Sequence, residues 1–193
     1  MISIVTKMSI ELRQQIEKIG SLTDDEFELV LALFKEKKFR KHQIVIQEGD
    51  YVQYDYFVVK GLMKSSHTNP EGKEHVIQFA MEDWWITDPQ AFHNQTKATL
   101  SVDCLEDTKV LALTLENKEK LCKELQKMEH FFLKKTIAGY IALQKRILCF
   151  ISNTASERYN NLIMQYPGLI QRVPKSMIAS YLGVTRETLS RLA

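Results

Sequence analysis

The spacing of apolar residues changes twice along this chain, and the change limits the folds that it can adopt. In about the first forty residues, apolar residues recur every three or four positions, as they do on one face of a helix, so this stretch is expected to be helical. From about residue 39 to residue 113 they alternate with polar residues or form short runs between turn formers, which is typical of strands. Helical spacing returns after Thr114. The pattern predicts an α+β fold, with a small antiparallel β-barrel or sandwich between helices.

Local signals place several of these elements. Thr23 and Glu26 form a capping box at the start of a helix, and a shorter helix is expected before it. The turn-forming run at residues 69–73 predicts a hairpin between the strands that flank it. A second pair of strands is expected around Glu106 and Asp107. The expected ranges are 8–19 for the first helix and 44–46, 56–59, 62–68, 75–80, 100–104 and 110–113 for the strands.

A long helix with two apolar seams is expected between Phe131 and Ile151. One seam consists of Ile137, Ile141, Leu148 and Ile151, and the other of Tyr140, Leu143, Ile147 and Phe150. Both seams keep the steps of three and four residues that coiled coils use, so the helix must bury two faces. We expect one seam to pack on the chain's own barrel and the seam that begins at Ile137 to pair with a second copy. The alternative is a helix buried wholly within one chain.

The composition excludes several classes of protein. The chain has 193 residues, of which 45% are hydrophobic and 26% charged, as in a folded domain with a core. No apolar run approaches the ~20 residues that cross a bilayer, and Lys7, Glu11 and Arg13 interrupt any signal peptide. We therefore expect a cytoplasmic protein with no membrane partner. The cysteines are odd in number and widely spaced, which favours neither disulfides nor a zinc site: Cys104, Cys122 and Cys149.

Residues 172–193, RVPKSMIASYLGVTRETLSRLA, have the pattern of a helix-turn-helix unit. Two helices that cross steeply need a small side chain where their backbones meet, which Ala179 supplies, and a turn residue that tolerates positive φ, which Gly183 supplies. Pro174 suits the first turn of the leading helix, and Thr185 can cap the second. Five apolar residues would close the interface: Ile178, Leu182, Val184, Leu189 and Leu192. The alternative is an ordinary helical hairpin whose charges face water.

The polar residues of the second helix indicate DNA as a partner. They are expected on its exposed side and near its N-terminus, which a recognition helix presents to the major groove: Thr185, Arg186, Glu187, Ser190 and Arg191. Arginine pairs with guanine, glutamate accepts from cytosine, and hydroxyl groups reach phosphates or bases. From Ile151 onward five cations stand against two anions, so the positive charge of the chain gathers here. We expect this segment to bind double-stranded DNA.

These motifs together resemble the Crp/Fnr family of bacterial transcription regulators. The stretch VTRETLSRL is similar to the family's recognition helix, and KHQIVIQEGDYVQYDYFVVKGLMK resembles its first barrel strands, with Gly49 and Gly61 at turn positions. The resemblance covers nearly the whole chain. It implies a jelly-roll β-barrel of the cyclic-nucleotide-binding type at 1–127, a central dimerisation helix at 128–152 and a helix-turn-helix domain at 153–193.

The resemblance also implies partners. A homodimer of this family would bind a two-fold symmetric DNA site with half-sites one helical turn apart. The residues that would contact bases are Arg186, Glu187 and Arg191. RNA polymerase and a small-molecule effector would be further partners, and the effector is not identified by the sequence.

The effector pocket departs from the family pattern. Members that bind cyclic nucleotides hold the cyclic phosphate with an arginine followed by Ser or Thr, and here Ala98 and Thr99 stand in those places. Asp88 has the pattern of a helix N-cap, so a carboxylate would already occupy the position of an anion. We expect cyclic AMP not to bind in the family's usual way. The pocket candidates are Trp84, Trp85, Thr87, Asp88, Lys97, Ala98 and Thr99.

Other effectors and activities are also limited by the residues present. An iron–sulfur sensor needs four cysteine thiolates, and the chain has three cysteines. Trp84 and Trp85 suit stacking on a flat ligand or packing in the core, and we expect the core. The chain has no catalytic motif and no metal-binding spacing, so we expect it not to be an enzyme. The histidines that haem ligation would have to use are isolated ones: His42, His67, His75, His93 and His130.

Two expectations concern the C-terminus and the competing function. The sequence stops at Ala193, before the β-hairpin wing that the resemblance implies, so either the protein is shorter than its relatives or the sequence is truncated. Without a wing, DNA binding would be weaker. The competing function is a sensor module of the cyclic-nucleotide-binding type that acts through a protein partner without binding DNA. The sequence does not indicate the operator, or whether regulation activates or represses.

Overall fold

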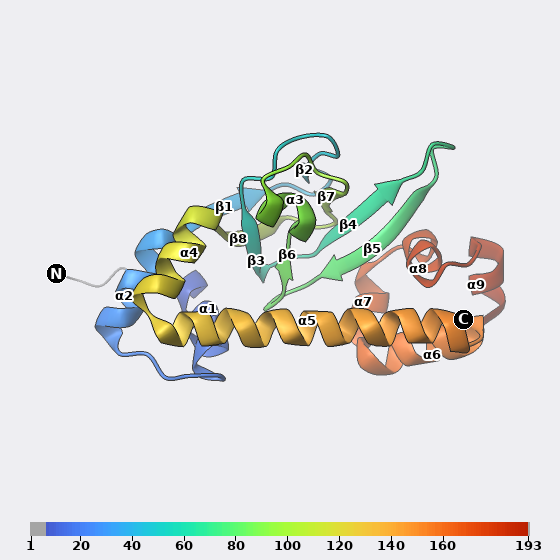
Figure 1. Ribbon diagram of the computed structural model, residues 1–193. Helices are drawn as coiled ribbons and strands as arrows, with labels where there is room; N and C mark the ends of the chain where they lie inside the picture. The colour runs from blue at the N-terminus through green and yellow to red at the C-terminus, as the bar shows by residue number, and fades with distance from the viewer. Residues whose placement is uncertain (1–6, 193) are drawn as a thin grey trace. The chain divides into compact units, whose positions relative to one another are not determined.

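The computed structural model describes residues 7–192, so the chain end at Ala193 lies outside the described residues (Figure 1). The contacts divide the chain into two compact units. The first contains the residues up to 65 together with residues 79–135. The second contains residues 66–78 and the residues from 136 onward. The second unit therefore combines the C-terminal helices with a hairpin from the first half of the sequence.

Four helices and the N-terminal part of a fifth surround the sheets of the first unit. They are α1 (Lys7–Glu17), α2 (Asp24–Leu33), α3 (Pro89–Asn94), α4 (Leu115–Glu124) and the start of α5 (Gln126–Ser152). The expected capping box is present at the start of α2, where Glu26 N–H donates to Thr23 Oγ1 at 3.2 Å. Thr114 caps α4 in the same way, where helical spacing was predicted to return.

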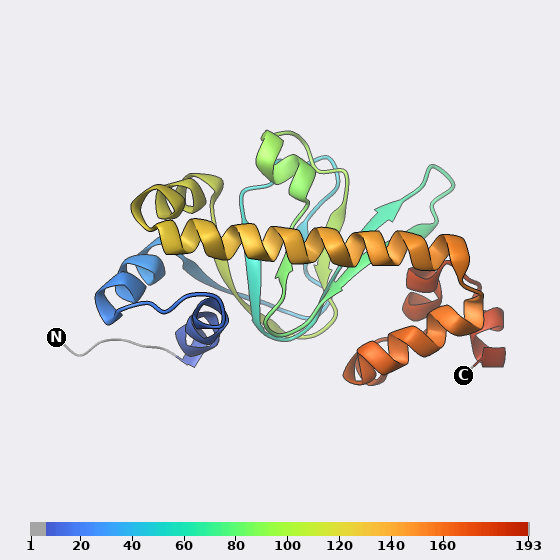
Figure 2. The same ribbon diagram turned by 60° about the horizontal axis from the view of Figure 1, so that its bottom comes forward.

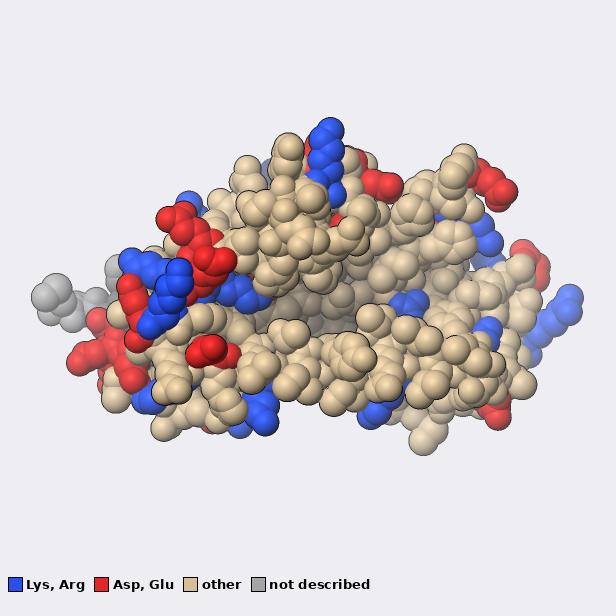
Figure 3. All heavy atoms as spheres, viewed as in Figure 1, with Lys and Arg blue, Asp and Glu red and all other residues tan. Residues whose placement is uncertain are grey.

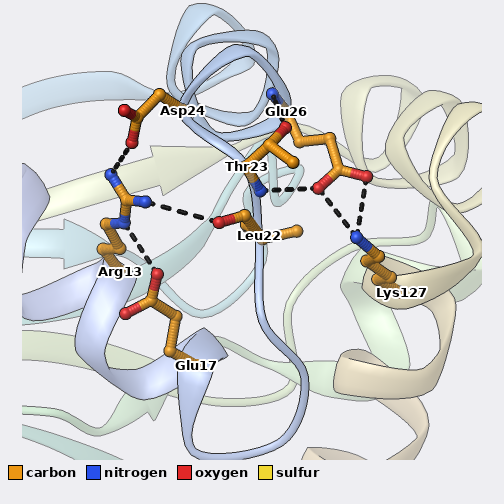
Figure 4. A network of polar contacts seen from close by, with 7 residues as sticks. All are labelled: Arg13, Glu17, Leu22, Thr23, Asp24, Glu26 and Lys127. Atoms are coloured by element: carbon orange, nitrogen blue, oxygen red, sulfur yellow. Dashed lines mark hydrogen bonds and ion pairs between the residues drawn. The ribbon is translucent and has the colours of Figure 1, made fainter.

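A polar network joins the first helices to α5 (Figure 4). Arg13 of α1 reaches the Asp24 carboxylate at 2.7 Å, and the Glu26 carboxylate accepts from Lys127 Nζ at 2.9 Å. The bond from Lys127 and the bond from the Thr23 N–H lower the pKa of Glu26 below its ordinary value. Each pair is exposed to solvent, so the network orients the helices more than it stabilises them.

Within residues 7–192, eight strands form two four-stranded sheets. The strand at Lys35–Phe39 lies in the first forty residues, where we predicted only helices. The first, in the order β1-β8-β3-β6, contains β1 (Lys35–Phe39), β8 (Thr108–Leu113), β3 (Asp55–Lys60) and β6 (Trp85–Ile86). The second, in the order β2-β7-β4-β5, contains β2 (Ile44–Ile46), β7 (Ser101–Cys104), β4 (Met63–Thr68) and β5 (Glu74–Ala80). The jelly-roll prediction is confirmed as a sandwich, and the described strands form no closed barrel.

One of the two predicted hairpins is present and the other is wrong. β4 and β5 flank the turn at 69–73, where Asn69 N–H donates to Lys73 O at 3.0 Å. β7 and β8 lie in different sheets, although turn formers separate them. The connection is a corner of the sandwich, because Leu105 is buried there and its N–H donates to Leu62 O at 2.7 Å. Gly61 turns at the same corner with φ of 110°, and a Cβ atom there would lie 2.8 Å from Asp107 O.

Alternate residues of β3 face two hydrophobic clusters. Phe57 and Val59 belong to the cluster that the helices cover, together with Phe131 at the start of α5. Tyr56 and Val58 belong to the cluster between the two sheets. This alternation follows from strand geometry, in which successive side chains point to opposite faces. The cluster between the sheets also includes Ala91 and Phe92 of α3.

The C-terminal helices belong to the second unit, together with the part of α5 beyond residue 135. α5 is one continuous helix (Figure 2). The helices that follow it are α6 (Ala155–Gln165), α7 (Pro167–Arg172), α8 (Lys175–Leu182) and α9 (Arg186–Leu192). A second capping box, formed by Thr154 and Glu157, begins α6. α6 ends at Gln165, and Pro167 begins α7.

Candidate DNA-contacting and effector sites

The predicted helix-turn-helix unit is present in α8 and α9. Ala179 is buried between the helices, and its carbonyl accepts from Val184 N–H at 3.0 Å, which closes the turn. Gly183 has φ of 67°, the left-handed conformation that the prediction required. Ile178, Leu182 and Leu189 are buried, whereas Val184 and Leu192 are half-buried. Pro174 precedes the helix, because α8 begins at Lys175.

The five polar residues that we expect to contact DNA are all exposed: Thr185, Arg186, Glu187, Ser190 and Arg191. Thr185 Oγ1 accepts from Thr188 N–H at 3.1 Å, so this hydroxyl also caps α9. Hydrogen bonds from backbone and from Thr185, and the charges of Arg186 and Arg191, lower the pKa of Glu187. Glu187 is therefore an ionised acceptor, as contact with a cytosine amino group requires.

Two residues that sequence analysis did not assign to this site support the turn from α5. The Phe150 ring lies where a side chain at Gly183 would be, since a Cβ atom there would come within 2.8 Å of the ring. Arg146, one helical turn earlier, donates to Tyr181 O at 3.1 Å and lies 4.0 Å from the Tyr181 ring centre. Gly183 is thus required both by its φ and by the close approach of Phe150.

Asp88, one of the pocket candidates, accepts hydrogen bonds at both of its carboxylate oxygens. One carboxylate oxygen accepts from Ala91 N–H at 3.1 Å, and the other accepts from Thr99 N–H at 2.7 Å and Leu100 N–H at 3.1 Å. Thr99 Oγ1 donates to the second oxygen as well, at 3.0 Å. Burial opposes the charged form, but these hydrogen bonds outweigh it, and the pKa of Asp88 lies below its ordinary value. The donors that could hold an anion are therefore already bonded to an internal carboxylate.

The other pocket candidates do not line one site: some are buried in the core and others are exposed. Ala98 is buried and bonds through its backbone to Gly49 and Asp50, and Thr87 Oγ1 donates to Tyr54 O at 3.0 Å. Lys97 is exposed and lies in a backbone bridge to Tyr51. The two tryptophans belong to separate clusters, and Trp85 lies against Phe57 with ring centres 5.4 Å apart. Core packing, the role that we expected for the tryptophans, is thus the one that Trp85 has.

The C-terminal half of α5 exposes apolar side chains from both predicted seams. Within the described residues of one chain, Ile137, Ile141, Leu148 and Ile151 are exposed, and so are Tyr140, Leu143, Ile147 and Phe150. Figure 3 shows mostly uncharged atoms along this part of the helix. The alternative of a helix buried wholly within one chain is wrong for this half.

Two further observations limit what the described residues can do. None of their helices combines the length and the apolar character needed to cross a bilayer. Among the same residues, no three His, Cys, Asp or Glu side chains are grouped as metal ligands.

Comparisons with known proteins agree with this architecture. The sequence model of the protein family described as the cyclic nucleotide-binding domain matches residues 36–125 of this chain. The anaerobic regulatory protein of Bacillus subtilis (strain 168) is 27% identical over 104 residues, which are 54% of this chain and 42% of that protein. Regulatory protein HlyX of Actinobacillus pleuropneumoniae is 25% identical over 169 residues, which are 82% of this chain and 70% of that protein. Both are named as regulatory proteins and neither as an enzyme, in agreement with our prediction.

A solved structure shares the fold beyond the matched domain. FixK2 from Bradyrhizobium japonicum has a TM-score of 0.71 at 20% identity, over 82% of each chain. Because it covers more of the chain than residues 36–125, the similarity extends beyond the matched domain. In sequence the chain is similar to two regulatory proteins, its residues 36–125 match the cyclic nucleotide-binding domain, and its fold is that of FixK2.

Proposed function

We propose that the chain is a cytoplasmic, homodimeric transcription regulator that binds double-stranded DNA through α8 and α9. The observation that carries this function is the exposed group of Arg186, Glu187 and Arg191 on a second helix whose position is fixed by a buried interface and the Gly183 turn. Arginines in such a place pair with guanine, and an ionised glutamate accepts from cytosine. Contact with RNA polymerase, which the family resemblance implies, is part of the proposal.

The effector side of the proposal follows from Asp88. Because its carboxylate already accepts from the backbone of Ala91, Thr99 and Leu100, a cyclic phosphate would have to displace it. The arginine that would hold the phosphate is replaced by the buried Ala98. We therefore propose that cyclic AMP does not bind in the family's usual way, and that any effector is a different small molecule.

The dimer is supported by the exposed apolar seam of α5. A soluble monomer rarely exposes a continuous apolar stripe of this kind, and the spacing of its residues is that of a coiled-coil seam. A second copy supplies a matching stripe, because a two-fold interface pairs the same surface of both chains. We propose Ile137, Ile141, Leu148 and Ile151 as the centre of this interface.

Selection of a duplex from random sequences tests DNA binding directly. After selection, Arg186→Ala and Arg191→Ala should each weaken binding by ~1–3 kcal/mol and relax the base preference at one position of each half-site. Lys123→Ala is a matched control, because it also removes one exposed cation but lies in α4. Unchanged affinity and preference in both arginine variants would refute the recognition helix and favour a module that acts through a protein partner.

A further inference from the structure

The hairpin of β4 and β5 contacts two helices within the second compact unit (Figure 1). Val76 N–H donates to Ser180 Oγ of α8 at 3.0 Å, and this hydroxyl donates to Glu74 O at 2.9 Å. Val76 O accepts from Arg146 Nη2 of α5 at 3.1 Å. The same guanidinium nitrogen also donates to Tyr181 O of α8. Two side chains thus connect one strand to both helices.

These contacts give the backbone of β5 the hydrogen bonds that a neighbouring strand would otherwise supply. β5 is the last strand of its sheet, so one of its edges has no strand partner. The backbone groups of Glu74 and Val76, two residues apart, point to the same edge. An open edge normally bonds to water or to another chain. Here Ser180 and Arg146 bond to it, and Val76 is only 2% exposed.

Arg146 must be fully hydrogen-bonded, because its charge is largely removed from water. Burial lowers the pKa of its guanidinium, although the group stays charged far above neutral pH. The ring centres of Tyr181 and Phe150 lie 4.0 Å and 5.4 Å from the guanidinium carbon. The carbonyl oxygens of Val76 and Tyr181 accept hydrogen bonds from the guanidinium. Tyr181 O is close to the C-terminal end of α8, where a cation is favourable. The hairpin and α8 must both be in place for the charge to be satisfied.

The contacts leave the proposed DNA-contacting surface free. Ser180 and Tyr181 lie on the first helix of the unit, whereas Arg186, Glu187 and Arg191 on the second stay exposed. A contact that blocked DNA would cover the second helix. This one instead holds the first helix, against which the second packs through the buried Leu189.

We propose that Ser180 and Arg146 are positioning residues for DNA binding, which hold the helix-turn-helix unit on the edge of β5 in the orientation that meets the major groove. The inference rests on the proposed DNA-binding function. A helix-turn-helix unit whose orientation is already fixed in the free protein binds DNA more tightly, because binding does not have to restrict that orientation. The contribution is the same for every DNA sequence, since neither residue contacts a base.

The test compares Ser180→Ala, which removes both hydrogen bonds to β5, with Ser180→Thr, which keeps the hydroxyl. Hydrogen exchange of the Val76 amide reports the contact, and binding to the selected duplex and to a singly mismatched one reports the function. Ser180→Ala should speed Val76 exchange about tenfold and weaken binding to both duplexes about tenfold, with an unchanged ratio between them. Ser180→Thr should restore both, and Ser156→Ala, an exposed serine of α6, should change neither.

Arg146→Lys gives a second, independent perturbation, because lysine keeps the charge but lacks the planar fork that reaches two carbonyls. It should reproduce both changes. Faster Val76 exchange with unchanged DNA affinity would overturn the inference, and so would unchanged exchange in Ser180→Ala. If the wild-type chain selects no duplex, the DNA-binding function fails and the positioning role with it, whereas Val76 exchange still decides whether the contact exists.

Discussion

Removal of the Asp88 carboxylate should destabilise the first compact unit by several kinds of lost hydrogen bond at once. Asp88 is 1% exposed and accepts from three backbone N–H groups and one hydroxyl. Loss of the N-cap of α3 costs ~1 kcal/mol. Each buried donor that is left without an acceptor costs ~1–3 kcal/mol, but water can replace part of this at the exposed Thr99. For Asp88→Ala we expect a loss of ~2–4 kcal/mol in the free energy of unfolding.

Urea denaturation followed by tryptophan fluorescence measures this loss. Both tryptophans of the chain, Trp84 and Trp85, lie in the same compact unit as Asp88, so the signal reports that unit. Asp88→Asn keeps an acceptor for Ala91 but turns an amide toward the donor of Thr99, so its loss should be smaller than that of Asp88→Ala. Asp50→Ala removes an exposed carboxylate from the neighbouring loop and should change stability by less than ~0.5 kcal/mol.

The same comparison has a defined pH dependence. Because the pKa of Asp88 is lower in the folded protein, its stabilising effect is complete above the unfolded value of ~3.9 and is lost as the pH falls through the folded value. The difference between wild type and Asp88→Ala should therefore be constant near neutral pH and shrink below about pH 4. A difference as small as that of Asp50→Ala, or one that grows as the pH falls, would refute the role of Asp88 as an internal anion.

Two other predictions concern the second copy and the effector. Leu148→Glu should weaken dimerisation more than about a hundredfold in sedimentation equilibrium, because a buried leucine contributes ~1.5–3 kcal/mol and occurs twice in a symmetric pair; Gln144→Glu, an exposed change on the same helix, is the control, and equal association of both variants would argue against this interface. Cyclic AMP at millimolar concentration should leave the melting temperature unchanged, whereas a ligand at a hundred times its Kd would add ~2.7 kcal/mol, so a saturable increase would contradict the proposed pocket.

Features that depend on short-range chemistry could be predicted from the sequence. The capping box at Thr23, the hairpin turn at 69–73 and the positive φ of Gly183 are all confirmed. Each depends on residues within a few positions of one another, so the residue types specify the local geometry. The N-cap role of Asp88 was predicted for the same reason, and its side chain does accept from Ala91 N–H.

Features that depend on distant backbone groups could not be predicted. The pairing of β7 with β8 was wrong, because turn formers mark a change of direction and do not say whether the chain returns to the same sheet. The role of Arg146 was missed because its acceptors are the carbonyls of Val76 and Tyr181, and a carbonyl has no signature in the sequence. The long-range bonds of Asp88 to Thr99 and Leu100 were missed for the same reason.

The membership of residues 66–78 in the second compact unit has a practical consequence for dividing the protein. A fragment cut at residue 136 would contain α8 and α9 but would lack the strand edge that Ser180 and Arg146 bond to. A fragment that ends at residue 135 would keep the hairpin and leave that edge open to other chains. The two compact units are therefore interleaved in the sequence, and neither can be excised or exchanged between relatives as a continuous segment without redesign of the edge of β5.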